Sequence, residues 1–490
     1  MLCSALPEAK SWQELETVLF ELSCISAELA PQRTGILRRV SSLRGASTVS
    51  PLAASALSEV FGHLLRRDID SSEPSAHPLC RAAAFRLAAA YAGWLSSQPA
   101  ALEAALHLAV EALSQPPAVA GRSLAPCAAN FVAQVGRDTG AQLAKLDHLL
   151  DGLLGVLPQV LSASGQSEAQ QQTGVLLIEG IARAVGCSPA EKLMSRLAVL
   201  VNPLTAQLRA ATASSANGGP EAVRVLSLLR STIQFLNTSA KSVQQAGQHP
   251  VLSIIEQVWP DVAGCASAFS ASPEVSSAIA ELLAMTLRSA DVSVVGAITA
   301  PVAELIIASN ATAPLSTGWL ELLTTVVEVC GRQMAAGAAG EASPDAGRIL
   351  EQLAQLVRTA VGQTLAAVGQ SDAGSAAPAV EAVLDVGFRC ALFCPVALVD
   401  GEVVSGLLGL AVASLGTDQR GPVRSACMLL SRLCQDVIRG GSERLPVVAA
   451  WFGGSAGASG GGTEAVVAIF KAASTTGAKE LVPKMTQVRR

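Results

Sequence analysis

Amphipathic helical segments follow one another from Trp12 to about Phe470, joined by short breaks rich in Pro, Gly and Ser. In the first of them, apolar residues such as Leu15, Leu19 and Leu22 recur at steps of three and four, which places them on one stripe of a helix. A pair of such helices cannot bury its apolar stripe alone and must stack on the next pair. The sequence therefore predicts an extended all-helical array.

The segments form pairs, and the spacing of successive pairs is close to the repeat length of HEAT or armadillo units, roughly 40 to 47 residues. Proline often stands at or near a predicted helix start, where its missing N–H costs nothing. After an opening helix at 12–29 and a short segment at 34–44, the predicted pairs are 51–67 with 78–97, 100–113 with 118–135, 143–161 with 170–185, 189–211 with 220–237, 250–269 with 273–288, 292–309 with 317–330, 346–368 with 378–393, and 403–415 with 422–438. We therefore expect an all-α fold, a HEAT/armadillo-like α-solenoid of about ten helix pairs.

The predicted array is one continuous domain over residues 1–440, followed by an irregular segment, 441–490, with a Gly-rich loop and a terminal helix from about Thr463. Three stretches dominated by Ala, Ser and Gly are expected to be loops between helices: Ala213–Gly219, Ala335–Pro344 and Gly453–Gly462. Neither end resembles the polar repeat that normally closes a solenoid, so we expect a portion of a longer array.

Composition narrows the functional classes. Aromatic residues make up 3% of the chain and charged residues 15%, with a formal net charge of −5, which argues against a nucleic-acid surface. The most apolar stretch, 292–308, is interrupted by Gly296, Pro301 and Glu304, and the N-terminus lacks a signal-peptide pattern. We expect a soluble, intracellular protein.

Residues with catalytic or metal-binding potential are scattered. The eleven cysteines form no CxxC pair, and Cys390 and Cys394, at helical i, i+4 spacing, are interpreted as small core residues in a reducing compartment. The histidines stand at 63, 77, 107, 148 and 249, without an HExxH motif, so no zinc site is predicted. No phosphate or dinucleotide loop stands in a strand–turn–helix context, and we expect neither a cofactor nor enzyme activity.

Three basic groups offer contacts to an acidic partner, although a solvated helix face explains each as well. They are Arg33, Arg38, Arg39 and Arg44; Arg66 and Arg67; and Arg420, Arg424 and Arg432. Arg420 is expected to precede its helix, whereas Arg424 and Arg432 share roughly one helix face.

Three stretches occur in an order and spacing that resemble a known family. They are WQELETVLFELSCISAEL (Trp12–Leu29), GQHPVLSIIEQVWPDV (Gly247–Val262), and the region from VEAVLDVGFRCALFCP, which begins at Val380, to TDQRGPVRSACMLLSRLCQDVI (Thr417–Ile438). Together they resemble the C-terminal portion of the transportin-SR branch of the importin-β (karyopherin-β) nuclear transport receptor family, over about residues 8 to 440.

The resemblance implies a right-handed superhelix whose outer A helices face solvent and whose inner B helices face cargo. It implies nuclear import, with shuttling between cytoplasm and nucleus, passage past FG-repeat nucleoporins and release of cargo by Ran-GTP. The family's N-terminal Ran-binding repeats have no counterpart in this sequence, so Ran-GTP is an expected partner only if that half exists. The branch carries Ser/Arg-rich splicing factors.

The counterpart of the family's arginine-lined cargo helix is Pro273–Arg288. Its polar face carries Glu274, Ser277, Glu281 and Arg288, which would repel a phosphorylated tail. The candidate partner-binding residues are Glu281, Arg288, Arg424 and Arg432. The alternative is a generic HEAT-repeat scaffold or regulatory subunit of a protein complex, which need not bind FG repeats in slots between outer helices.

Overall fold

The computed structural model describes residues 9, 11–24, 51–65, 73–115, 123–163, 167–214, 218–236, 243–245, 247–289, 292–337, 344–440 and 446–453. These residues form helices joined by turns, and no strand occurs among them. The chain divides into two compact units, unit 1 with residues 1–206 and 231–254, and unit 2 with residues 207–230 and 255–490. Three helices contribute residues to both units: α12 (Ala190–Ala213), α13 (Gly219–Phe235) and α15 (Pro250–Ala268).

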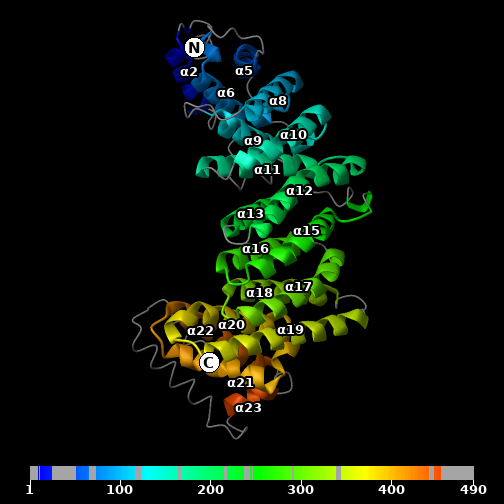
Figure 1. Cartoon of the computed structure of the whole chain (residues 1–490), viewed down its shortest axis with the longest axis vertical. Coiled ribbons are helices and arrows are strands. Elements are labelled where there is room, and N and C mark those ends of the chain that lie inside the picture. Colours follow the sequence, from blue (N-terminus) through cyan, green and yellow to red (C-terminus); the bar gives the residue numbers. More distant parts are fainter. Residues whose placement is uncertain are drawn as a thin grey trace. The chain divides into compact units, whose positions relative to one another are not determined.

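Unit 1 is a two-layer stack of helix pairs (Figure 1). Its A layer contains α5 (Pro51–Leu64), α8 (Pro99–Ser114) and α10 (Asp147–Ala163), each packed on the next. Its B layer contains α6 (Pro78–Ala90), α9 (Ala125–Leu143) and α11 (Glu168–Gly186), with α2 (Trp12–Cys24) packed on α6. Two short elements accompany α6, the 3-10 turn η1 (Pro74–Ala76) before it and α7 (Ala92–Leu95) after it.

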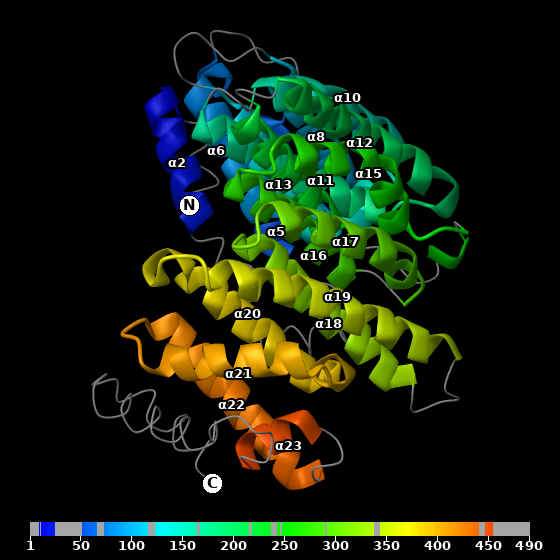
Figure 2. The same cartoon turned by 60° about the horizontal axis from the view of Figure 1, so that its bottom comes forward.

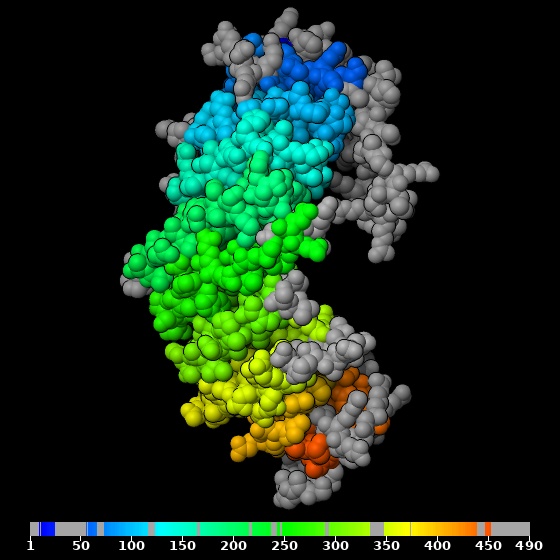
Figure 3. Space-filling view, turned by 90° about the vertical axis from the view of Figure 1, so that its right-hand side faces the viewer, coloured from blue at the N-terminus to red at the C-terminus, as the bar shows by residue number. Residues whose placement is uncertain are grey.

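Unit 2 repeats the arrangement, as Figure 2 shows for the pairs α19–α20 and α21–α22. Its A layer contains α17 (Val292–Thr312), α19 (Pro344–Val368), α21 (Gly401–Leu415) and α23 (Pro446–Gly453). Its B layer contains α16 (Pro273–Ser289), α18 (Thr317–Gly337), α20 (Ala373–Phe393) and α22 (Arg420–Gly440), and η2 (Pro395–Leu398) follows α20. Successive segments form adjacent bands on the surface of each unit (Figure 3).

Small aliphatic residues fill the space between the layers. The buried residues are mostly Leu, Ala and Val, which allow helices to approach closely. Between α9 and α11 the approach depends on glycine: a Cβ at Gly136 would lie 2.7 Å from the Cα of Gly180. These observations confirm the predicted all-α, HEAT-like α-solenoid, in which each helix pair buries its apolar stripe against its neighbours.

Ion pairs join neighbouring helices within each layer of unit 1. In the B layer, Arg137 of α9 donates two hydrogen bonds, both at 2.5 Å, to the carboxylate of Glu179 on α11, whose side chain is only 6% exposed. Arg183 also pairs with Glu179, at 3.2 Å. In the A layer, the nearly buried Arg196 of α12 pairs with Asp147 of α10 at 2.6 Å. Such pairs fix how successive helices are aligned.

Several helix boundaries differ from the prediction. The break expected after Val135 is absent, because α9 continues to Leu143 through a kink at Thr139 (φ −144°, ψ 30°). Likewise α20 begins at Ala373 rather than at Pro378. The prediction that Arg420 precedes its helix is wrong, because α22 begins at Arg420. A kinked helix still buries a continuous face, so tertiary packing overrides the local break signal.

Proline also lies inside helices, within ranges that the sequence predicted to be helical. Pro158, Pro203, Pro260 and Pro301 stand within α10, α12, α15 and α17, which are the first helices of four successive pairs. An internal proline removes one i→i−4 hydrogen bond and bends a helix. An internal proline in the first helix of each of these successive pairs is a repeat pattern that is visible in the sequence.

One helix is apolar enough to be compared with a membrane span. By length and composition, residues Val294–Thr312 of α17 could cross a membrane, with a mean hydropathy of 1.6, and a third of that window is buried. Here α17 packs against α16, α18 and α19 in the stack of unit 2. We therefore assign its apolar character to this packing.

Several predicted features lie outside the described residues. They are the basic groups Arg33, Arg38, Arg39, Arg44 and Arg66, Arg67, the C-terminal helix from Thr463, and most of the loop at 453–462. The division at residue 440 stays a prediction. Cys390 and Cys394 are buried, as expected, and burial raises the pKa of both thiols. Cys24 and Cys187 are exposed.

Candidate partner-binding surface

A hollow with a volume of about 320 Å³ lies on the exposed side of the B layer in unit 2. It extends over α16, α18 and α20 and reaches the end of the unit 2 part of α13. We name it the charged hollow after its charged lining residues, which are Arg230, Glu281, Arg288, Glu321, Glu328, Asp385 and Arg389.

Helical periodicity explains how these side chains meet. Glu281 and Arg288 are seven residues apart on α16, which is two turns, and therefore lie on one face. Glu321 and Glu328 have the same spacing on α18, and Asp385 and Arg389 are four apart on α20. Because α16, α18 and α20 pack side by side, their polar faces form one continuous surface.

Most of the guanidinium groups are already paired. Arg230 pairs with Glu281, and Arg389 lies 3.4 Å from the carboxylate of Glu328. Arg332, beside the hollow on α18, is 2.6 Å from the other oxygen of Glu328. Arg288 differs, because its guanidinium donates to the Thr325 hydroxyl at 3.1 Å.

Two carboxylates of the hollow are poorly compensated. Burial in the hollow raises the pKa of Glu321, and the negative charges of Glu281 and Asp385 add to that effect. Burial also raises the pKa of Asp385, although the charges of Arg389 and Arg424 oppose it. A raised carboxyl pKa means that the ionised form is disfavoured, so the site gains free energy when a cation approaches.

The four predicted partner-binding residues lie in different surroundings. Glu281 and Arg288 line the charged hollow, while Arg424 on α22 pairs with Glu381 of α20 at 2.7 Å, one turn from Asp385. Arg432 pairs with Asp436 of its own helix at 2.8 Å and does not line the hollow.

On α16 the structure separates residues that the sequence analysis placed on one polar face. The carboxylate of Glu274 accepts a hydrogen bond from the Ser272 hydroxyl at 2.9 Å, at the start of the helix, and neither Glu274 nor Ser277 lines the hollow. Three further residues of the hollow, Glu321, Asp385 and Arg389, were not predicted from the sequence. Their signal was the recurrence of charge at steps of four and seven on consecutive second helices of the pairs.

A second groove lies in the A layer of unit 2, between α19 and α21, with a volume of about 580 Å³. Its lining mixes the apolar Leu365 and Val403 with Gly362 and with charged groups. Arg358, which also lines it, has a buried Nε without a hydrogen-bond partner. We name this the A-layer groove.

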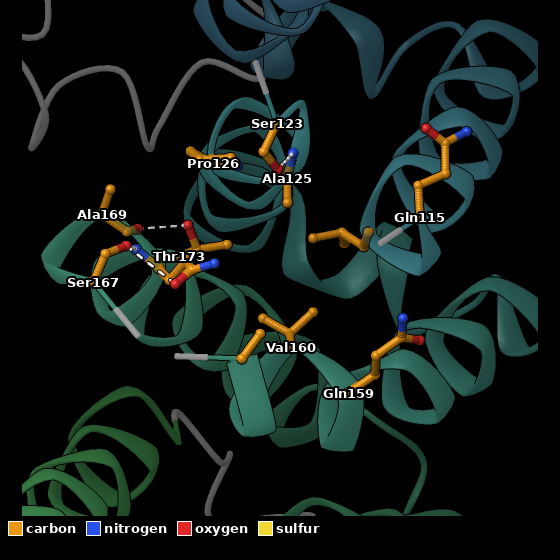
Figure 4. A pocket seen from close by; sticks show the side chains of 12 residues that line it. Gln115, Ser123, Ala125, Pro126, Gln159, Val160, Ser167, Ala169 and Thr173 are labelled. Atoms are coloured by element: carbon orange, nitrogen blue, oxygen red, sulfur yellow. Dashed lines mark hydrogen bonds between the residues drawn. The ribbon is translucent and has the colours of Figure 1, made fainter. Parts of the chain in front are cut away.

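A third hollow, of about 310 Å³, lies in unit 1 between α8, α9, α10 and α11. Figure 4 shows Gln115 and Gln159 on one side of it, Ser167 and Thr173 on the other, and Val160 between them. Among the described residues that line it none is ionisable, and these residues offer apolar contact and neutral hydrogen bonds.

The fold and these surfaces define a class: a HEAT-like α-solenoid with a charged B-layer face. No protein-family model and no curated protein sequence matches the chain. Among solved structures, one described as importin 13 in its cytosolic state is similar, with a TM-score of 0.72 at 16% identity. The match covers 99% of this chain and 50% of that one, so the chain spans about half the length of that importin.

A circular tandem repeat protein with a novel repeat topology also matches, at 14% identity with a TM-score of 0.28, over 95% of this chain and 99% of that one. The UNC-45 chaperone matches at 13% identity with a TM-score of 0.24. TM-scores this low do not support any inference about this chain from either protein. The similarity to importin 13, at its low identity, shows that the two proteins share a fold.

Proposed function

We propose that this chain is a non-enzymatic transport receptor of the importin-β type that binds a protein cargo on the B-layer face of unit 2. It would act as the cargo-binding portion of such a receptor and would shuttle between cytoplasm and nucleus. The importin-like fold over 99% of the chain supports this proposal. Membership of the transportin-SR branch rests only on the three resembling stretches of sequence and is part of the proposal. The single observation that carries the cargo assignment is the charged hollow.

The charges in the hollow favour a basic cargo segment that is not phosphorylated. Glu321 and Asp385 gain most from an added cation, whereas Arg230 and Arg389 are already engaged with carboxylates. Arginine or lysine side chains would neutralise the two carboxylates, and a phosphate would meet them as a like charge. A phosphorylated Ser/Arg-rich tail is therefore a poorer fit than its unphosphorylated form.

FG-repeat nucleoporins would bind on the opposite layer, and the A-layer groove is the candidate slot. Leu365 and Val403 provide apolar contact there, and Val399, which precedes the groove residue Asp400 in the chain, is 49% exposed. A phenylalanine side chain gains stability when such surface is covered. Coupling to Ran-GTP is part of the proposal only for a receptor that also contains Ran-binding repeats.

The cargo assignment can be tested with a fluorescent arginine-rich peptide and the full chain. We expect binding that weakens with salt and that weakens further when the peptide's serines are phosphorylated. Glu321→Gln should weaken binding by about three- to tenfold, because one partly screened ion pair is lost. Glu304→Gln removes the same charge from the exposed A-layer face of α17 and should leave the affinity unchanged.

The receptor assignment has its own test, retention on FG-repeat beads. Gly362 lines the A-layer groove and has no atom within 4 Å of where a side chain would begin, so Gly362→Gln should fill the groove and reduce retention. Gly409→Gln, at an equally open position of α21 outside the groove, is the matched control. Peptide binding without FG retention would favour the scaffold alternative, and loss of both would refute the proposal.

A further inference from the structure

Two consecutive A-layer helices of unit 1 bring together three side chains that commonly bind metals. Glu103 and His107 are four residues apart on α8 and therefore lie on one helix face. His148 is the second residue of α10, the next helix of the layer, which packs against α8. Two imidazoles and a carboxylate thus converge from neighbouring repeats.

Their separations fit a metal centre. One ligand atom from each of the three side chains can be chosen so that all lie within 4.8 Å of one another. The His148 Nε2 is 3.3 Å from the Glu103 Oε1, and the two imidazole ring centres are 5.3 Å apart. Around tetrahedral zinc, with ligand bonds of about 2.0–2.1 Å, ligand atoms are about 3.3 Å apart. The Glu103–His148 pair already has that spacing.

We propose that Glu103, His107 and His148 form a zinc site that bridges α8 and α10. Two histidines and one glutamate are a common zinc ligand set, with water in the fourth position. The side chains of His148 and Glu103 are 56% and 43% exposed, so the ion can reach them without separation of the helices. His107 is partly exposed, and a small rotation of its side chain would complete the ligand set.

The consequence is mechanical. A metal ion held by both helices fixes the spacing of two consecutive A-layer helices, whose relative positions otherwise depend on apolar packing and exposed ion pairs. Because zinc would bind the folded unit and not the unfolded chain, it stabilises unit 1 in proportion to its concentration. The site is independent of the proposed cargo and nucleoporin surfaces, which lie in unit 2.

Isothermal titration of ZnCl₂ into the full chain, freed of metal with EDTA, tests the site. We expect binding at the His/Glu site and a rise in the thermal unfolding midpoint with added zinc. His107→Gln, His148→Gln and Glu103→Gln should each weaken binding to this site at least about tenfold. His63→Gln removes a histidine of α5 outside the group and should change neither readout.

CoCl₂ provides an independent readout that separates this site from the exposed thiols of Cys24 and Cys187. Cobalt at the proposed site should give the visible absorption of a tetrahedral complex without a thiolate charge-transfer band, and His148→Gln should abolish it. The proposal is refuted if zinc does not bind, or if its affinity and the zinc-induced rise in midpoint are the same in all three variants as in the parent. A thiolate band that persists in those variants would assign the metal to cysteine instead.

Discussion

Replacement of Gly180 by alanine tests how closely the B-layer helices approach. A Cβ at this position of α11 would lie 2.5 Å from the carbonyl oxygen of Val132 and 2.7 Å from its carbonyl carbon. Both are backbone atoms of α9, so no side-chain rotation relieves the contact. The two helices must separate for the alanine to fit.

The expected magnitude follows from two opposing terms. Alanine in a helix interior is more stable than glycine by roughly 0.5–1 kcal/mol, because the unfolded chain loses freedom. Forcing an extra methyl group into a packed interface costs about 1–3 kcal/mol, and here the atoms that must move belong to a helix backbone. We therefore expect Gly180→Ala to lower the free energy of unfolding by about 1–2 kcal/mol.

Gly155 provides the matched control. It lies in the interior of α10, it is exposed, and no atom lies within 4 Å of a built Cβ. Gly155→Ala should therefore stabilise the protein by roughly 0.5–1 kcal/mol. The same chemical change is thus predicted to have opposite signs at two helical positions of unit 1.

The assay should read both global and local stability, since a chain with two compact units need not unfold in one step. Thermal unfolding followed by circular dichroism gives the sign, and hydrogen–deuterium exchange of peptides from α9 and α11 locates the effect. If Gly180→Ala is as stable as Gly155→Ala, with unchanged exchange in both helices, the close approach of α9 and α11 is wrong.

Three further predictions concern polar groups. Burial opposes ionisation of Glu179, but Arg137 lowers its pKa overall, so its stabilisation is present above the ordinary pKa near 4.5 and is lost as the pH falls through the lowered value. Glu179→Gln should therefore cost about 1–3 kcal/mol in urea unfolding at neutral pH, with a smaller difference in acid. Glu321 has a raised pKa, so its contribution is fully present below the ordinary value and is lost as the pH rises through the folded one. Glu321→Gln should raise the free energy of unfolding in urea at neutral pH by less than about 1 kcal/mol, because solvent still screens this partly buried carboxylate, and no gain should remain in acid. Asn310, fully buried in α17, donates to the carbonyl of Ala360 in α19 at 3.0 Å, so Asn310→Ala should cost about 1–3 kcal/mol and increase exchange in both helices.

Most of the fold could be predicted from local patterns in the sequence. Apolar spacing predicted the helices and their pairing, and the pair α17–α18 begins at the predicted residues, Val292 and Thr317. It misplaced boundaries where tertiary contacts outweigh a local signal, as at Thr139, where α9 kinks and continues, and at Pro378, which lies inside α20. A proline or a kink costs one or two hydrogen bonds, and continued burial of the helix face offsets that cost.

The candidate surfaces were only partly predictable. The spacing of Glu281 and Arg288 was enough to place both on one helix face, and they do line the charged hollow. Glu321 and Asp385 belong to the same hollow but stand on other helices, so nothing local connects them. The same holds for His148, which meets Glu103 and His107 only because α10 packs beside α8.

The sequence by itself determined that this protein is a stack of helix pairs with a small-residue interior, because helical periodicity and apolar spacing are local properties of the chain. Only the tertiary structure decided which exposed faces lie next to one another. Which faces meet depends on how far each helix pair is shifted along the next. That shift is fixed by contacts between residues about one repeat apart, such as the close approach of Gly136 to Gly180 and the ion pair of Arg137 with Glu179. The charged hollow and the His/Glu group exist because of that alignment.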